Sequence, residues 1–137
     1  MKLITRDSDY ALRAILYIAE ISKKEKGLII SVDEIVKELD LPKEHTRLLL
    51  KKLAENKILK SYKGRKGGFT LLEPANKISV AEILEIFQGD IDSDFCVLKN
   101  EPCPNIKQNC RLRARLKKIN SLIKDEFKKS TIESLIK

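Results

Sequence analysis

Two short helix-forming segments separated by a tight turn constrain the fold of this chain more than any other part of its sequence. The first, VDEIVKEL (32–39), follows Ser31, whose hydroxyl can accept a hydrogen bond from the amide of Glu34 while the Glu34 carboxylate reaches back, forming a capping box. After the turn, Pro42 can open the next helix, PKEHTRLLLKKLAENK (42–57), because its missing amide donor is not needed in a first turn. The pair predicts a helix-turn-helix motif, whose second helix enters a major groove.

The second helix of this motif has an apolar side and a charged side. We expect the apolar side, made of Leu49, Leu50 and Leu53, to be buried. The more exposed side chains are candidates for major-groove contacts, and they are Lys43, Glu44, His45 and Arg47. Arg47 is the strongest candidate for a guanine because its guanidinium can donate two parallel hydrogen bonds. Lys51 or Lys52 would hold phosphates.

The next segment, KILKSYKGRKGGFTLLEP (57–74), predicts a two-stranded hairpin with a basic, glycine-rich tip. A basic hairpin directly after a recognition helix is typical of a wing, whose cations reach phosphates or the minor groove. Arg65 and Lys66 at the tip are the candidate phosphate contacts. A solvated hairpin with incidental lysines is the alternative, and the preceding helix-turn-helix favours the wing.

Further helices are expected on both sides of this unit. Residues 9–22 carry one apolar helix face, and Ser79 with Glu82 forms a second capping box that starts a short helix ending before Gly89. A long cationic helix from Arg111 onward has a coiled-coil-like apolar stripe, made of Leu112, Leu116, Ile119 and Ile123. This stripe either covers the chain's own core or packs against a second copy, and a homodimer would suit a two-fold DNA site.

Length and charge agree with a DNA-binding protein. The chain has 137 residues, a formal net charge of +8 and a sequence pI of about 9.4, which suits a polyanionic partner such as double-stranded DNA. Charges interrupt the first apolar stretch, so we expect neither a secretory signal nor a membrane span, and hence a cytoplasmic protein. No constellation typical of an enzyme is present. We expect a mainly α chain with a winged helix-turn-helix domain over 1–89 and a cysteine loop with a dimerisation helix over 90–137.

The three cysteines, Cys96, Cys103 and Cys110, lie in one polar segment. Three thiols cannot all form disulfides, and no close cysteine pair typical of structural zinc is present. Inert buried cysteines fit poorly with a segment rich in proline, asparagine and lysine. The thiolates could instead wrap an iron–sulfur cluster, in which another residue can replace a fourth cysteine. From the spacing alone, the cluster and the simpler explanations stay open.

The order of these parts resembles the Rrf-two superfamily of winged-helix regulators, which includes the iron–sulfur cluster regulator IscR, the nitric-oxide sensor NsrR and the iron regulator RirA. The matching stretches cover almost the whole chain: SDYALRAILYIA, LPKEHTRLLLKKLAENKIL, GRKGGFTLLEPANKISVAEILEIFQG and CVLKNEPCPNIKQNCRLRARL. The resemblance implies a dimeric repressor or activator. Its cluster would lie in the loop before the dimerisation helix and control DNA binding.

The resemblance also implies ligands. Cys96, Cys103 and Cys110 match the family's cluster thiolates, whereas the IscR-type histidine is absent because its position is Arg113. In NsrR-like members the fourth ligand is an aspartate of the other subunit, and Asp9 occupies that position here. Asp7 is the near alternative to Asp9, and a helix-capping or first-turn acid is the simpler role for Asp9. The thiol spacing is one residue longer than in several members, which leaves a 2Fe–2S and a 4Fe–4S cluster both open.

These expectations combine into one hypothesis with two rivals. A cluster joining the first helix of one subunit to the loop of the other would set the separation of the two DNA-binding domains. Redox conditions, nitric oxide or iron supply would set the state of the cluster, and that state would control DNA affinity. One rival is a regulator of the same fold that uses its thiols by oxidation or zinc binding. The other is an adaptor that no longer binds DNA.

Overall fold

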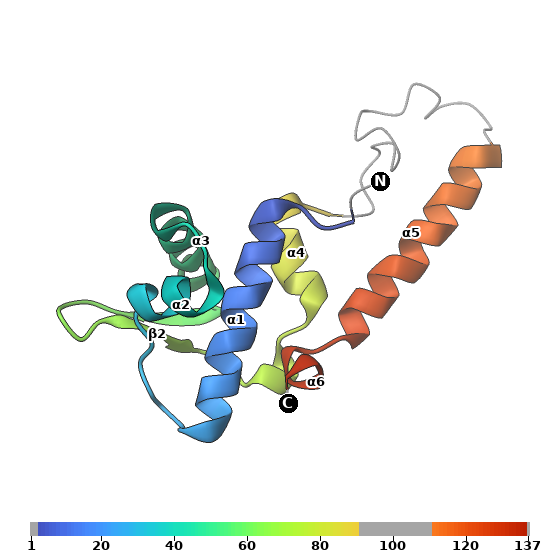
Figure 1. Cartoon of the computed structure of the whole chain (residues 1–137). Coiled ribbons are helices and arrows are strands. Elements are labelled where there is room, and N and C mark those ends of the chain that lie inside the picture. The colour runs from blue at the N-terminus through green and yellow to red at the C-terminus, as the bar shows by residue number, and fades with distance from the viewer. Residues whose placement is uncertain (1–2, 91–110, 137) are drawn as a thin grey trace.

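The computed structural model describes residues 3–90 and 111–136, and these residues are mainly helical (Figure 1). The elements follow in the order α1 (Arg6–Lys24), α2 (Val32–Leu39), α3 (Lys43–Glu55), β1 (Leu59–Tyr62), β2 (Gly68–Leu71), the short 3-10 helix η1 (Ala75–Lys77), α4 (Val80–Gln88), α5 (Arg111–Lys129) and α6 (Ile132–Leu135). The predicted order of helix, helix-turn-helix, hairpin, short helix and long helix is therefore confirmed.

Helix α1 is the centre of the fold and packs against α2, α3, α4, α6 and β2. Its buried apolar face repeats at helical spacing through Ala11, Ala14, Ile15, Ile18 and Ala19, and the small alanines let neighbouring elements approach closely. The helix begins at Arg6, three residues before the expected start, because Thr5 caps it by accepting a 3.3 Å hydrogen bond from the Ser8 amide.

The helix-turn-helix forms as predicted, with two local differences. Ser31 caps α2 by accepting from the Glu34 amide at 3.1 Å, but the Glu34 carboxylate accepts from the Tyr17 hydroxyl of α1 at 2.9 Å. The second half of the expected capping box is thus replaced by a contact between helices. Pro42 precedes α3 as its N-cap residue instead of opening it as the first helical residue.

The hairpin also forms as predicted. Strands β1 and β2 pair antiparallel, with Leu59 opposite Leu71 and Tyr62 opposite Gly68. A further bridge joins Ile30, just before α2, to Phe69. Only glycine fits at position 68, because a Cβ there would collide with the carbonyl group of Ile30. The base of the wing is therefore fixed to the helical body.

Helices α4 and α6 pack into the helical body, whereas the long helix α5 between them extends away from most of it. The predicted capping box at α4 is complete, with Ser79 and Glu82 exchanging hydrogen bonds of 3.2 and 2.9 Å. Ile132 of α6 is fully buried in the core, and a bridge joins Ser79 to Thr131. Helix α5 runs beside α4 and away from α2, α3 and the wing (Figure 1). The division at residue 89 stays a prediction, although Ile132 belongs to the core of the first part.

Candidate nucleic-acid interface

Helix α3 presents two opposite faces with the same spacing. The inner face is buried and consists of Thr46, Leu49, Leu50 and Leu53. The outer face is exposed and consists of Glu44, Arg47, Leu48 and Lys51. Both sets follow offsets of three, four and seven residues, which is the repeat of one helix face. Packing of the inner face against α1, α2 and β1 thus fixes the outer face toward solvent, as a groove-reading helix requires.

Three of the predicted DNA-contacting residues at the start of α3 lie in ion pairs near its exposed side. Lys43 Nζ lies 2.8 Å from Asp33 Oδ1 on α2, and this hydrogen bond raises the pKa of Lys43. Arg47 Nη2 lies 3.1 Å from Glu44 Oε2, one turn earlier on the same helix. Pairs this exposed contribute little to stability, so they can open at low cost when a phosphate or base approaches.

Two other predicted residues of α3 turn toward neighbouring helices. His45 is half-buried, its Nε2 lies 2.7 Å from Asp7 Oδ1 of α1, and its ring meets the Tyr10 ring edge-on with centroids 6.0 Å apart. Lys52 places its ammonium 5.3 Å from the centroid of the Phe87 ring on α4. The structure therefore places both at the edges of the outer face, in contact with the elements that support α3.

The predicted wing cations lie at the exposed tip of the hairpin. Arg65 and Lys66 are both exposed, in the turn between β1 and β2. Figure 1 shows this turn extending beyond the helical body. The outer face of α3 and the wing tip together offer the basic groups that a major groove and its flanking phosphates require.

The first turn of α1 is held by a hydrogen-bond network that the sequence patterns did not reveal. Gln88 at the end of α4 accepts through Oε1 from the Ser8 hydroxyl at 2.8 Å and from the Thr5 amide at 3.0 Å, and its Nε2 donates to the Leu3 carbonyl at 2.9 Å. These partners are 80 to 85 positions from Gln88 in the sequence, so no local spacing could have indicated them. This hydrogen-bond network fixes the acidic first turn of α1 beside the end of α4.

Asp9, the candidate cluster ligand, belongs to that acidic first turn together with Asp7. Its Oδ1 lies 3.3 Å from Nε of Arg13, and its side chain is 45% exposed. Thr5, not Asp9, is the N-cap residue. The other candidate ligands, Cys96, Cys103 and Cys110, lie outside the described residues, and within residues 3–90 and 111–136 no cluster of three His, Cys, Asp or Glu side chains could hold a metal.

Helix α5 leaves much of its apolar surface uncovered by the described chain. Asn120 is the only buried residue of α5, whereas Leu112, Ile119 and Leu122 are 62%, 41% and 61% exposed. Leu116 and Ile123, the other members of the predicted stripe, are partly buried. The stripe thus covers little of the core that the described residues form.

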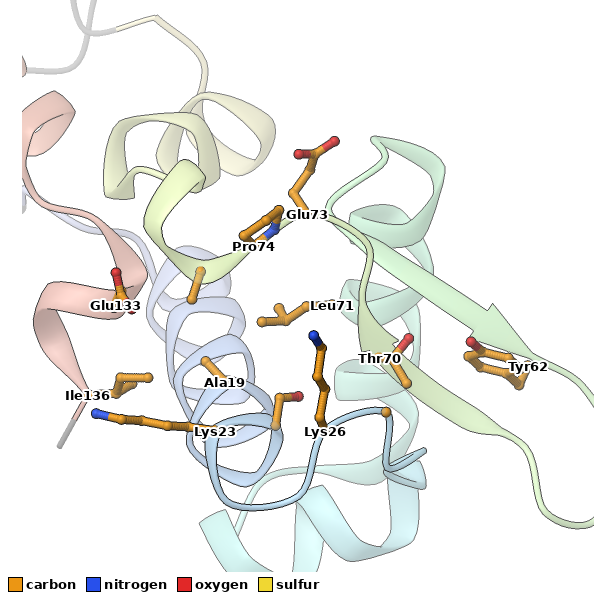
Figure 2. Close-up of a pocket in the computed structure, with 13 residues that line it drawn as sticks. Ala19, Lys23, Lys26, Tyr62, Thr70, Leu71, Glu73, Pro74, Glu133 and Ile136 are labelled. Carbon is orange, nitrogen blue, oxygen red and sulfur yellow. The ribbon is translucent and has the colours of Figure 1, made fainter.

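A separate pocket of about 550 Å³ lies at the base of the wing, between the end of α1, the hairpin and α6 (Figure 2). Its walls combine an apolar floor around Leu71 and Ile136 with lysines and glutamates at the rim. Figure 2 shows the Lys26 side chain extending beside Leu71. Among the described residues, neither Asp9 nor any of the predicted DNA-contacting side chains lines this pocket, so it is distinct from the outer face of α3.

Comparison with known proteins decides the family. The family model described as "Rrf2: Iron-dependent Transcriptional regulator" matches residues 4–137. The chain belongs to the Rrf2 family. A candidate HTH-type transcriptional regulator of Aquifex aeolicus is 30% identical over 128 residues, which cover 93% of this chain and 86% of that protein.

Solved structures of similar fold include two Rrf2-type regulators of different kinds. CymR, the global cysteine regulator of B. subtilis, superposes with a TM-score of 0.75 at 21% identity and covers 98% of this chain and 96% of its own. IscR of T. potens gives a TM-score of 0.74 at 18% identity and covers 98% of this chain and 85% of its own. The predicted family and winged-helix fold are thereby confirmed. This Rrf2 chain is a transcriptional regulator, since its relatives are named as regulators and not as enzymes.

Within residues 3–90 and 111–136 of this Rrf2 protein, no helix is long and apolar enough to cross a membrane.

Proposed function

We propose that this Rrf2 protein is a cytoplasmic, homodimeric regulator that binds a two-fold DNA operator and changes its affinity with the state of an iron–sulfur cluster. The observation that carries the DNA-binding part is the outer face of α3, which is exposed and charged while the opposite face is fully committed to the core. The net charge of +8 adds the long-range attraction that phosphates supply.

In this proposal the two basic elements have different tasks. Lys43, Glu44 and Arg47 contact bases in the major groove, with Arg47 directed at a guanine. Lys51, Arg65 and Lys66 hold phosphates on either side, and their loss would weaken binding to every sequence alike. His45 and Lys52 act at the edge of the interface, where their contacts with Asp7 and Phe87 also hold α3 in place.

The proposed cluster site joins Cys96, Cys103 and Cys110 of one subunit to the Asp9 side chain of the other. Asp9 fits a ligand role because its side chain is 45% exposed and its pair with Arg13, at 3.3 Å, lies at the surface, where it can open at low cost. A carboxylate is a harder ligand than a thiolate, so a cluster held this way, when bound, would supply a labile and reactive centre. The family description as iron-dependent supports an iron-containing group but not its type.

The described contacts offer a route from Asp9 to the DNA-reading helix. Asp7, in the same turn of α1, pairs with His45 of α3, and Gln88 holds that turn to α4. A shift of the first turn of α1 would therefore reach α3 directly, through the contact between Asp7 and His45. This supports the proposal that ligation at Asp9 biases the position of the reading head.

The decisive test of the cluster is to purify the protein without oxygen and to measure its visible absorbance, iron and acid-labile sulfide. We expect visible absorbance with matched iron and acid-labile sulfide, and their loss in Cys103→Ala. Colourless protein that cannot be reconstituted with iron and sulfide, yet binds DNA, would contradict the cluster and leave the DNA-binding part standing. Equal DNA affinity with and without the cluster would contradict the sensing mechanism.

A cluster-free thiol regulator is the second candidate, and the CymR-type structures favour it. One of them, from Staphylococcus aureus, is described as an oxidised form and superposes with a TM-score of 0.75 at 24% identity. Asp9→Ala separates the two candidates, because it should cripple a cluster sensor and leave a response based on thiol oxidation or zinc unaltered.

An adaptor without DNA binding is the remaining rival, and charge reversal at the wing tests it. Arg65→Glu should weaken operator binding strongly, whereas Lys77→Glu, an equal charge change on η1, should weaken it less. If Arg65→Glu is silent in every DNA-dependent assay, the adaptor is favoured.

A further inference from the structure

Leu48 stands out on the outer face of α3 because it is an apolar side chain among charged ones. It is 57% exposed, and it shares the face with Glu44, Arg47 and Lys51. A single exposed leucine needs no explanation on most surfaces. Leu48, however, lies on the outer face of α3, opposite the buried face. The outer face is the one that a major groove would cover.

The DNA major groove offers one prominent apolar group to such a side chain. Thymine projects its C5-methyl group there, and apolar side chains distinguish thymine by contact with it. The other base-pair edges in the groove are hydrogen-bond donors and acceptors, which a leucine cannot satisfy. We propose that Leu48 is a specificity-determining residue that reads the methyl group of a thymine in each half-site.

The geometry of α3 restricts where that thymine lies. A helix rises about 1.5 Å per residue, whereas successive base pairs are about 3.4 Å apart. Leu48 directly follows Arg47, so the two side chains reach the same base step or adjacent ones. The thymine therefore neighbours the base pair that Arg47 contacts. This inference rests on the proposed function, since it requires that α3 enters the groove.

Removing one methyl group from the DNA tests the contact without disturbing the protein. The operator is first selected from a pool of random duplexes with the full-length protein. Each thymine of the half-site is then replaced by uracil in both half-sites, and Kd is measured at fixed salt. We expect one position at which the loss is roughly three- to fivefold per half-site, the effect of burying one methyl group.

The matching protein variant is Leu48→Ala, which keeps the helix because alanine is the best helix former. In this variant, uracil and thymine at that position should bind equally, while Leu28→Ala, a change at an exposed leucine outside α3, should keep the full discrimination. Circular dichroism and the oligomeric state of each variant establish that the fold is intact.

Three outcomes are distinguishable. Discrimination that disappears only in Leu48→Ala supports the inference. Operator binding with no thymine whose methyl group matters, or discrimination that persists in Leu48→Ala, overturns it and leaves the proposed function intact. A protein that selects no DNA from the pool overturns both.

Discussion

Helices α1 and α5 have the same length of 19 residues and opposite relations to the rest of the chain. Helix α1 buries six residues against its own chain, whereas α5 buries only Asn120 and leaves Leu112, Ile119 and Leu122 exposed. Both carry an apolar stripe at helical spacing. The difference teaches that the stripe predicts a partner but not which chain supplies it. For α1 the partner is the chain itself, and for α5 we propose a second copy.

The largest effect should come from charging the exposed stripe of α5. Leu112 and Ile119 are seven residues apart and share one face. The double variant Leu112→Glu with Ile119→Glu should be monomeric at concentrations where the parent protein is a dimer, because like charges would meet in the apolar interface. Operator affinity should fall by about two orders of magnitude, since one half-site is lost. Sedimentation and DNA titration measure both. A parent protein that is already monomeric would contradict the proposed dimer.

The second effect compares matched isoleucines of the two helices. Ile18→Ala in α1 removes a fully buried side chain and should lower the free energy of unfolding by about 2–5 kcal/mol. Ile119→Ala in α5 should change the unfolding of the isolated subunit by less than about 0.5 kcal/mol and weaken self-association instead. Urea unfolding at several protein concentrations separates these contributions. Equal losses independent of concentration would show that α5 is part of the subunit's own core.

A smaller effect is expected from Gln88, which holds the start of α1. Gln88→Ala removes three hydrogen bonds and should cost about 1–3 kcal/mol of stability. Hydrogen exchange should increase in the first turn of α1 and not at its C-terminal end. Asn76→Ala, which removes an amide side chain on η1 and away from this contact, serves as the control. Uniform exchange changes along α1 would argue against a local clamp.

The smallest effect is a pH dependence of the contact between α1 and α2. Burial and the hydrogen bond to Glu34 raise the pKa of Tyr17 to about 12, from 10.0. The folded state therefore holds this proton more tightly than the unfolded state, so the associated stability is complete below pH 10 and is lost as the pH rises toward 12. Tyr17→Phe should lose less stability than the parent protein between pH 9 and 11, as measured by urea unfolding. Identical pH slopes would contradict the shift.

Local patterns were sufficient for most of the secondary structure. The capping box at Ser79, the leucine spacing of α3 and the glycine-rich turn of the hairpin each depend on neighbours within a few residues, and all were confirmed. The errors were local as well. Glu34 was expected to complete a cap on its own helix, but Tyr17 of α1 competes for its carboxylate.

The candidate site was predictable in part for the same reason. The exposed charges of α3 and the wing tip follow from periodicity, and the structure places Glu44, Arg47 and Lys51 together on one face. Leu48 escaped prediction because a leucine in an apolar run resembles its buried neighbours until the helix is oriented. The orientation of His45 and Lys52 also escaped it, because their partners Asp7 and Phe87 are distant in sequence.

The sequence by itself determined the order of the elements, the basic character of the chain and the residue types available to the proposed DNA and cluster sites, because each depends on composition or on contacts within a turn. Only the tertiary structure decided that Gln88 holds the start of α1, that His45 pairs with Asp7 and that Leu48 faces outward. These depend on which helix faces meet across the fold. That choice is made by burying the apolar faces together, and no short stretch of sequence contains it.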